Sequence, residues 1–193
     1  LIAENNLYGY NLEGANLQEA DLQQADLSNA MLNKANLLGA KLNEAKLEKA
    51  DLSGAKLQTA DLSRTFLERA ILQGANLSLT KLYNSNLKYA DLNGANLANA
   101  ILKNANLQGA DLRNTTGIIK EQLMSTRNHK LALYDKNWLT ILNLPEEHAD
   151  NLKKKNLSGY DFEGTDLRNA VLKGVQLNGA VFKDANLYEA DLS

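Results

Sequence analysis

The 193-residue sequence contains no cysteine and only one proline, Pro145. The lack of cysteine excludes disulfide bonds and thiolate metal sites, but it does not identify a cellular compartment. No run of about 18 apolar residues occurs, which argues against insertion into a membrane. The 21 Lys and Arg residues nearly balance the 23 Asp and Glu residues, so neither a basic nucleic-acid-binding surface nor a strongly acidic surface is expected.

The chain begins with Leu1 rather than Met, which suggests a processed or excised N-terminus. We expect a soluble protein. Its location stays open between the cytoplasm and, if a signal peptide was removed before Leu1, the periplasm or the thylakoid lumen.

The most regular feature that is present is a five-residue repeat. Leucine occupies every fifth position from Leu7 to Leu112, and alanine usually stands two residues before it. In an α-helix, five residues advance by about 140°, so these leucines would spiral around the axis instead of forming one apolar face. In a straight strand, successive leucines would point to opposite faces. The repeat therefore predicts one short extended segment and one turn in every five residues, with Ala and Leu pointing inward.

Tandem units such as ANLQE, ADLQQ, ADLSN, ANLLG and ADLSG resemble the repeats of pentapeptide-repeat proteins, in particular those of cyanobacteria. The resemblance covers residues 5–114 and about 156–193. It implies an all-β solenoid, namely a right-handed quadrilateral parallel β-helix in which four pentapeptides, or 20 residues, complete one coil. It also implies that most relatives have no known function, that some imitate DNA at a type II topoisomerase, and that one is implicated in cell differentiation.

A coil of 20 residues would place side chains 20 positions apart on top of one another, at a spacing of about 4.8 Å. Three series in the sequence support this period, because alternating charges, asparagines and glycines each recur at that interval. The same period places Arg69 one coil below Tyr89, near enough for a cation–π contact. The series are Asp21, Lys41, Asp61, Lys81 and Ile101; Asn16, Asn36, Lys56, Asn76 and Asn96; and Gly54, Gly74 and Gly94.

Helical patterns replace the repeat between residues 116 and 155. We expect helices at about 119–131 and 136–142, the second with Asp135 as its N-cap, and a third segment from Pro145 to Lys155. The chain thus divides into a first β-helical block (1–115), a mainly α-helical insertion (116–155) and a second block (156–193). Because the second block supplies only about two coils, we expect it to continue the same solenoid. A helical lid between two separate stacks is the alternative.

The repeat pattern assigns roles to two sets of residues. The buried core is represented by Leu12, Leu32, Leu52, Leu57, Leu72, Leu92, Leu112, Leu157, Phe162 and Leu177. Large apolar side chains at outward positions or in the insertion are candidates for partner contacts, namely Phe66, Tyr83, Tyr89, Tyr134, Trp138 and Leu139. His129 and His148 accompany no catalytic or metal-binding motif, so we expect structural or surface roles for both. No catalytic, cofactor or metal site is predicted.

A rigid rod without catalytic motifs predicts a non-enzymatic scaffold for protein–protein interactions, with an unidentified protein partner and no nucleic-acid partner. The binding surface would combine one face of the solenoid with the insertion. The alternative, implied by the resemblance, is a DNA mimic that modulates a type II topoisomerase such as gyrase, but the balanced charge argues against it. An enzyme with a site at the insertion is least favoured. An open apolar coil end also suggests an end-to-end homodimer.

Overall fold

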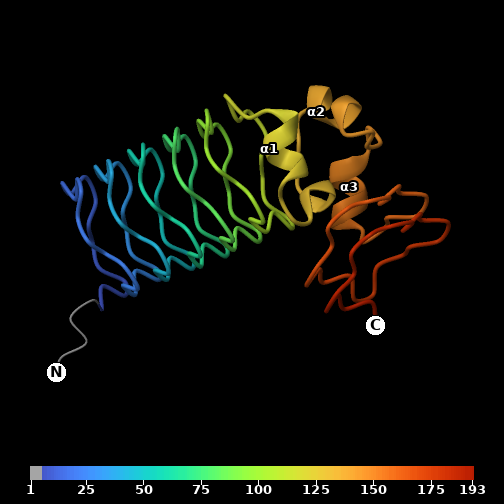
Figure 1. Ribbon diagram of the computed structural model, residues 1–193, viewed down its shortest axis with the longest axis horizontal. Helices are drawn as coiled ribbons and strands as arrows, with labels where there is room; N and C mark the ends of the chain where they lie inside the picture. Colours follow the sequence, from blue (N-terminus) through green and yellow to red (C-terminus); the bar gives the residue numbers. More distant parts are fainter. Residues whose placement is uncertain (1–5) are drawn as a thin grey trace.

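The computed structural model describes residues 6–193, which form two stacks of coils with short helices at their junction (Figure 1). The first stack begins at Asn6, and the second comprises residues 156–193. The described residues contain parallel bridges but no longer strand, because each side of a regular coil contributes a single bridged residue. The helices are α1 (Lys120–Met124), the 3-10 helix η1 (His129–Leu131), α2 (Lys136–Ile141) and α3 (His148–Lys153).

Main-chain hydrogen bonds define the coils of the first stack. The N–H of Leu57 donates to the carbonyl of Asn76 at 2.9 Å in the next coil, and the N–H of Asn76 donates back to Ala55 at 2.9 Å. Within the coil, the N–H of Ala60 donates to the carbonyl of Leu57 and closes the turn. Successive bridged residues, such as Lys56 and Asn76, are 20 positions apart. The predicted period of 20 residues is therefore confirmed.

Asn and Asp recur before the leucines because their side chains close the following turn. The Oδ1 atom of Asn76 accepts a hydrogen bond from the N–H of Ser78 at 3.1 Å, and Oδ1 of Asp91 accepts one from Asn93 at 3.0 Å. Side-chain oxygens of Asn and Asp are suited to such local bonds. The second residue after each leucine of the regular coils has a positive φ, as Gly54 does at 63°, which explains why glycine recurs there.

The apolar core extends along the inside of both stacks. Each buried leucine contributes roughly 1.5–3 kcal/mol to folding before chain entropy is subtracted. Leu12 and Leu177 are only half-buried, because they lie in the first and last described coils. The other predicted core residues are buried, namely Leu32, Leu52, Leu57, Leu72, Leu92, Leu112, Leu157 and Phe162.

The insertion first adds one irregular coil to the first stack. Along the last three bridges of this stack, the sequence separation between the two bridged residues increases. Helix α1 takes the place of one coil side (Figure 1). The expectation of one continuous helix over 119–131 is wrong. The chain leaves α1 after Met124 and pairs again with the preceding coil of the first stack. A mainly α-helical insertion is thus not confirmed. The bridges join Asn96 to Thr116, Asn106 to Arg127, and Asp111 to Leu133.

The remainder of the insertion forms α2 and α3. Helix α2 agrees with the expected helix over 136–142, and Asp135 stands at its N-terminus without capping it through its side chain. Instead, Oδ2 of Asp135 accepts a hydrogen bond from the N–H of Asn114 at 2.7 Å and ties α2 to the first stack. Helix α3 begins at His148, three residues later than the expected start at Pro145.

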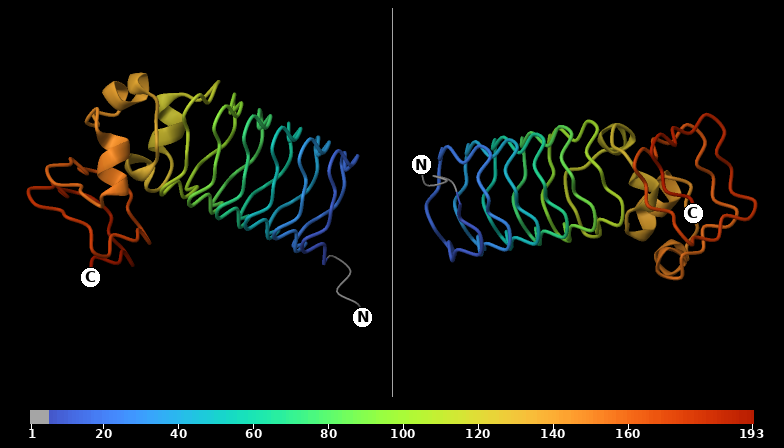
Figure 2. Two further views of the ribbon diagram at one scale, coloured as in Figure 1. Left: turned by 180° about the vertical axis from the view of Figure 1, so that it is seen from behind. Right: turned by 90° about the horizontal axis from the view of Figure 1, so that it is seen from below.

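The second stack does not continue the ladder of the first, contrary to the expected single solenoid. Its bridges lie within residues 156–191, and no bridge among the described residues joins the two stacks. The helices lie at the junction in every view (Figure 2). The physical reason is that residues 134–155 form α2, α3 and their loops instead of a coil. The two stacks are therefore separate ladders that meet beside a helical layer and also contact each other directly.

Candidate functional site

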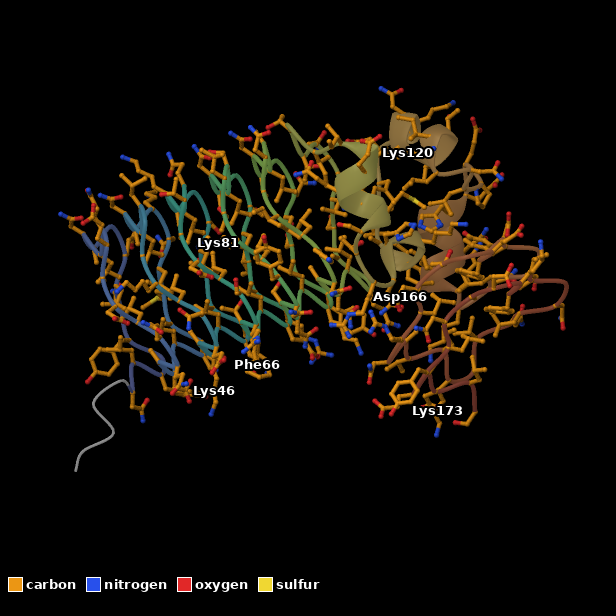
Figure 3. The ribbon with its side chains drawn as sticks, in the orientation of Figure 1. Lys46, Phe66, Lys81, Lys120, Asp166 and Lys173 are labelled. Carbon is orange, nitrogen blue, oxygen red and sulfur yellow. The ribbon has the colours of Figure 1, made fainter. Side chains whose placement is uncertain are left out.

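Three of the six candidate interaction residues lie on the first stack. Phe66 and Tyr89 have 46% and 44% of their surface exposed, and Phe66 projects from the side of the rod (Figure 3). Tyr83 is half-buried at a polar corner beside Arg64. The guanidinium of Arg69 lies 5.6 Å from the centre of the Tyr89 ring, which confirms the predicted cation–π contact.

The other three candidates lie in the insertion, and two of them are corrected by the structure. Tyr134 and Leu139 are 5% and 8% exposed and pack in the core, so neither offers a surface to a partner. The hydroxyl of Tyr134 donates to the carbonyl of His129 at 2.9 Å, which fixes the ring inside the junction. Trp138 is half-buried against the same core.

His148 links α3 to the irregular coil of the insertion and to the second stack. Its Nε2 lies 2.7 Å from the carbonyl of Ala132 and therefore carries the proton, because a carbonyl can only accept. Its Nδ1 lies 2.9 Å from the hydroxyl of Tyr160, which then acts as the donor. Burial lowers the pKa of His148, because desolvation disfavours the imidazolium ion. The expectation of a structural histidine agrees with this burial.

An aromatic column extends from the insertion into the second stack. Adjacent ring centres lie between 5.2 and 6.5 Å apart along its length. Contacts of this kind add to apolar burial and orient the second stack on the helical layer. The column consists of Tyr134, His148, Tyr160, Phe162 and Phe182.

Side chains and one main-chain N–H take the place of a neighbouring coil where the second stack begins. The Nε2 atom of Gln108 donates to the carbonyl of Val171 at 2.9 Å, and the N–H of Val171 donates to Oε1 of Gln108 at 3.1 Å. The N–H of Asn128 donates to the carbonyl of Asp166 at 2.7 Å, and Nζ of Lys130 donates to that of Asp161 at 2.6 Å. These bonds satisfy polar groups that a preceding coil would otherwise pair, and they protect the open edge.

A cleft of about 370 Å³ lies beside these bonds and is formed by both stacks together with the insertion. We call it the junction cleft. Its apolar walls include Leu131 and Leu133 from the insertion and Leu157, Leu172 and Val175 from the second stack. Tyr89 forms part of its wall on the first stack, next to Gly109. A side chain at Gly109 would collide with the Tyr89 ring, so glycine leaves room for the ring there.

Three lysines give the junction cleft a positive rim. Lys153 forms an exposed ion pair with Asp150 at 3.7 Å, whereas Lys155 and Lys173 have no ion pair within 4 Å in the described part of the chain. The described residues that line the cleft include no Asp or Glu. Of the six predicted interaction residues, only Tyr89 belongs to this site. Lys153 and Lys155 belong to the lysine run at 153–155, which by sequence alone is more typical of a solvated helix end than of a binding site.

Other kinds of site were also sought. Across residues 6–193, no cluster of three or more His, Cys, Asp or Glu side chains could hold a metal ion. Over the same range, every helix is too short to span a bilayer.

Comparison with known proteins identifies the family. The sequence matches the family model for Pentapeptide repeats, in 8 copies, over residues 11–48, 50–88, 80–116 and 156–193. The chain therefore belongs to the pentapeptide-repeat family, whose members fold as right-handed quadrilateral β-helices. The comparison with curated proteins gives no match.

Several solved structures are similar to this chain. HetL, a pentapeptide-repeat protein involved in regulating heterocyst differentiation in the cyanobacterium Nostoc sp. strain PCC 7120, is 32% identical over 96% of this chain and 75% of its own, with a TM-score of 0.29. Rfr23 from the cyanobacterium Cyanothece 51142 is 32% identical over 70% of this chain and 90% of its own, with a TM-score of 0.25. A protein from the Arabidopsis thaliana thylakoid lumen is 33% identical over 60% and 73%, with a TM-score of 0.28.

Proposed function

We propose that this protein is a non-enzymatic scaffold that binds a protein partner in the junction cleft. The observation that carries the proposal is the composition of the cleft, because an apolar hollow is joined there by three lysines without a lining carboxylate. Clefts with apolar walls and a few polar groups at the rim are typical of binding sites. Membership of a family of repeat proteins that generally serve as structural or interaction modules supports a scaffold over an enzyme.

The chemistry of the cleft favours one kind of occupant, a peptide segment with one or two apolar side chains flanked by carboxylates. The apolar side chains would pack against walls such as Leu133 and Leu172, and the carboxylates would pair with Lys155 and Lys173. Both stacks and the insertion contribute to the walls, so the site depends on how the two stacks are held together.

DNA mimicry is less well supported. The surface ladder alternates in charge, with Lys41 paired to Asp21 at 3.5 Å and Lys81 paired to Asp61 at 3.3 Å. Each lysine neutralises a carboxylate that would otherwise imitate a phosphate. Inhibition of gyrase in a DNA supercoiling assay by the intact protein would reverse this ranking.

Selection from a random peptide library on the intact protein tests the proposed occupant. We expect enrichment of peptides with an aromatic or aliphatic residue between Asp or Glu residues. Val171→Asp introduces a negative charge into the lining of the cleft and should weaken their binding by about tenfold or more. Val181→Asp is the matched control, because Val181 is 46% exposed, compared with 48% for Val171, and lies outside the cleft.

Two results would overturn the proposal. One is selection of basic or uncharged peptides, which would contradict the role of the lysine rim. The other is equal weakening by Val171→Asp and Val181→Asp, which would place binding elsewhere on the second stack. Lys155→Glu provides an independent check, because reversing one rim charge should weaken the binding of acidic peptides and leave the fold unchanged.

A further inference from the structure

A second polar feature lies at the seam between the stacks, outside the lining of the junction cleft. Two guanidinium groups converge there on Asn104: Nε of Arg127 donates to its carbonyl at 2.9 Å, and Nη2 of Arg168 lies 3.4 Å from its Oδ1. A third cation, Lys88, donates from Nζ to the carbonyl of Asn169 at 3.1 Å. Figure 3 shows nitrogen-bearing side chains gathered beside the labelled Asp166 at this seam.

Of these three cations, only Arg168 is paired with a carboxylate within 4 Å in the described part of the chain. Asp166 is held by Arg168, with Nε at 2.9 Å and Nη2 at 2.6 Å from its two oxygens. Neither Lys88 nor Arg127 has an ion pair within 4 Å in the described part of the chain. Glu68 acts on Lys88 electrostatically, but its carboxylate lies 3.9 Å from Arg69, which balances it. The group of Lys88, Arg127, Arg168 and Asp166 therefore carries a net charge of about +2 at neutral pH.

The electrostatic environment of the seam agrees with this excess of positive charge. Burial lowers the pKa of Lys88, and the nearby Arg127 lowers it further. Burial also lowers the pKa of Arg127, and the charge of Arg168 lowers it further. Half-buried cations that repel one another destabilise the fold unless an anion compensates them.

Hydrogen bonding to the second stack alone does not require these charges. At neighbouring points of the same seam, the neutral amides of Gln108 and Asn128 donate to main-chain carbonyls of Val171 and Arg168. Arg127 uses only Nε for its carbonyl partner, and its two Nη groups have no hydrogen-bond acceptor among the described residues. The planar guanidinium thus retains the pair of donors that suits an oxyanion.

We propose that Lys88, Arg127 and Arg168 form a binding site for a phosphate dianion. The charge of the ion matches the excess at the seam, and its oxygens can accept from the Nη groups of Arg127 and from Nζ of Lys88. The bound ion joins residues of the first stack, the insertion and the second stack, so it stabilises the junction. The site is independent of peptide binding in the junction cleft.

Isothermal titration calorimetry with inorganic phosphate at pH 8 and constant ionic strength tests the proposal. We expect saturable binding with a Kd below about 1 mM, and a loss of about tenfold or more in Arg127→Gln. Arg64→Gln is the matched control, because Arg64 is an exposed arginine paired with Glu44 at 3.1 Å on the first stack. It should bind phosphate as the unaltered protein does.

The proposal is overturned if the unaltered protein gives no saturable heat, or if Arg64→Gln weakens binding as much as Arg127→Gln. Should Arg127→Gln fail to fold by circular dichroism, Lys88→Gln replaces it, because Lys88 contacts only the edge of the second stack. O-phosphoserine in a parallel titration distinguishes the source of the phosphate group. Binding of both ligands indicates a site open to phosphate monoesters, whereas binding of inorganic phosphate alone indicates a site for the free ion.

Discussion

The side chain of Gln108 pairs with both backbone polar groups of Val171, donating at 2.9 Å and accepting at 3.1 Å. In the regular part of the solenoid, the main chain of the preceding coil makes such bonds, as when the N–H of Asp61 donates to Ala40 at 2.9 Å. One glutamine thus replaces a coil side at the point where the two stacks meet. The orientation of the second stack depends mainly on side chains, because no ladder of bridges among the described residues joins the two stacks.

Gln108→Met should destabilise the junction specifically. The change keeps the volume of the side chain but removes both bonds to Val171, at a cost of about 1 kcal/mol because Val171 is partly exposed. Hydrogen exchange measured by mass spectrometry should show earlier exchange in residues 157–193 and unchanged protection in residues 7–112. Gln58→Met is the control, since Gln58 has the same place in the repeat and its Oε1 has no partner in the described structure. Equal effects of the two changes would contradict this role of Gln108.

Acid should weaken the fold through the two buried histidines. Burial lowers the pKa of His129 from 6.5 to about 4 and also lowers that of His148. Between these pH values the unfolded chain binds protons that the folded chain does not, so stability is full above pH 6.5 and falls as the pH is lowered. His129 alone accounts for about 2 kcal/mol between pH 7 and pH 5.

Urea denaturation at pH 7 and pH 5 measures this loss, and His129→Leu should reduce it because the titrating group is gone. The carboxylates with lowered pKa, such as Asp61 and Asp111, lose their contribution only at more acidic pH. The interval from pH 5 to pH 6.5 therefore isolates the histidines. An unchanged pH dependence in His129→Leu would refute the assignment.

The turn-closing role of Asp61 separates its charge from its hydrogen bond. Its Oδ1 accepts from the N–H of Ser63 at 3.0 Å, and Oδ2 pairs with Lys81 at 3.3 Å. Asp61→Asn keeps the acceptor and loses an exposed ion pair, so a change below about 0.5 kcal/mol is expected. Asp61→Ala also loses the turn bond and should cost about 1 kcal/mol. Thermal denaturation at low and high salt distinguishes the two contributions. A loss of stability in Asp61→Asn as large as that in Asp61→Ala would assign the main effect to the ion pair.

The regular coils could be predicted from the sequence because every stabilising contact there recurs at a fixed spacing. Leu57 and Leu72 are buried, and Asp61 bridges to Lys81, as the five- and 20-residue periods require. The hydrogen bonds that Asn and Asp side chains accept from the following turn were not predicted, although the recurrence of Asn and Asp was the signal for them. Periodicity reports which residues face inward, but it does not say why a polar position prefers one side chain.

The junction could not be predicted in the same way. Gln58 and Gln108 occupy the same place in the repeat, yet only Gln108 contacts a residue 63 positions away. Nothing in the local sequence distinguishes them, because the difference is that the second stack packs beside the last coil, where Gln108 lies. Tyr134 was assigned to the surface for a related reason: an aromatic residue in an irregular segment has no period that reveals whether it faces the core.

Gly109→Ala tests whether the wall of the junction cleft depends on a small residue. Gly109 has a φ of +68°, and an added methyl group would collide with the Tyr89 ring. Gly74 has a φ of +63° with no atom near an added methyl group, so Gly74→Ala measures the backbone cost alone, about 1 kcal/mol. Gly109→Ala should cost about 1–3 kcal/mol more, because the ring must move.

The double variant Tyr89→Ala/Gly109→Ala identifies the source of that extra cost. If the ring causes it, adding Gly109→Ala to Tyr89→Ala should cost no more than Gly74→Ala does, which a double-mutant cycle in urea denaturation measures. The ring must move to relieve the collision, which changes its contact with Arg69 and the wall of the cleft. Gly109→Ala should therefore weaken the binding of acidic peptides even where the protein remains folded. Equal stability of Gly109→Ala and Gly74→Ala, with unchanged peptide binding, would remove Tyr89 from the wall of the site.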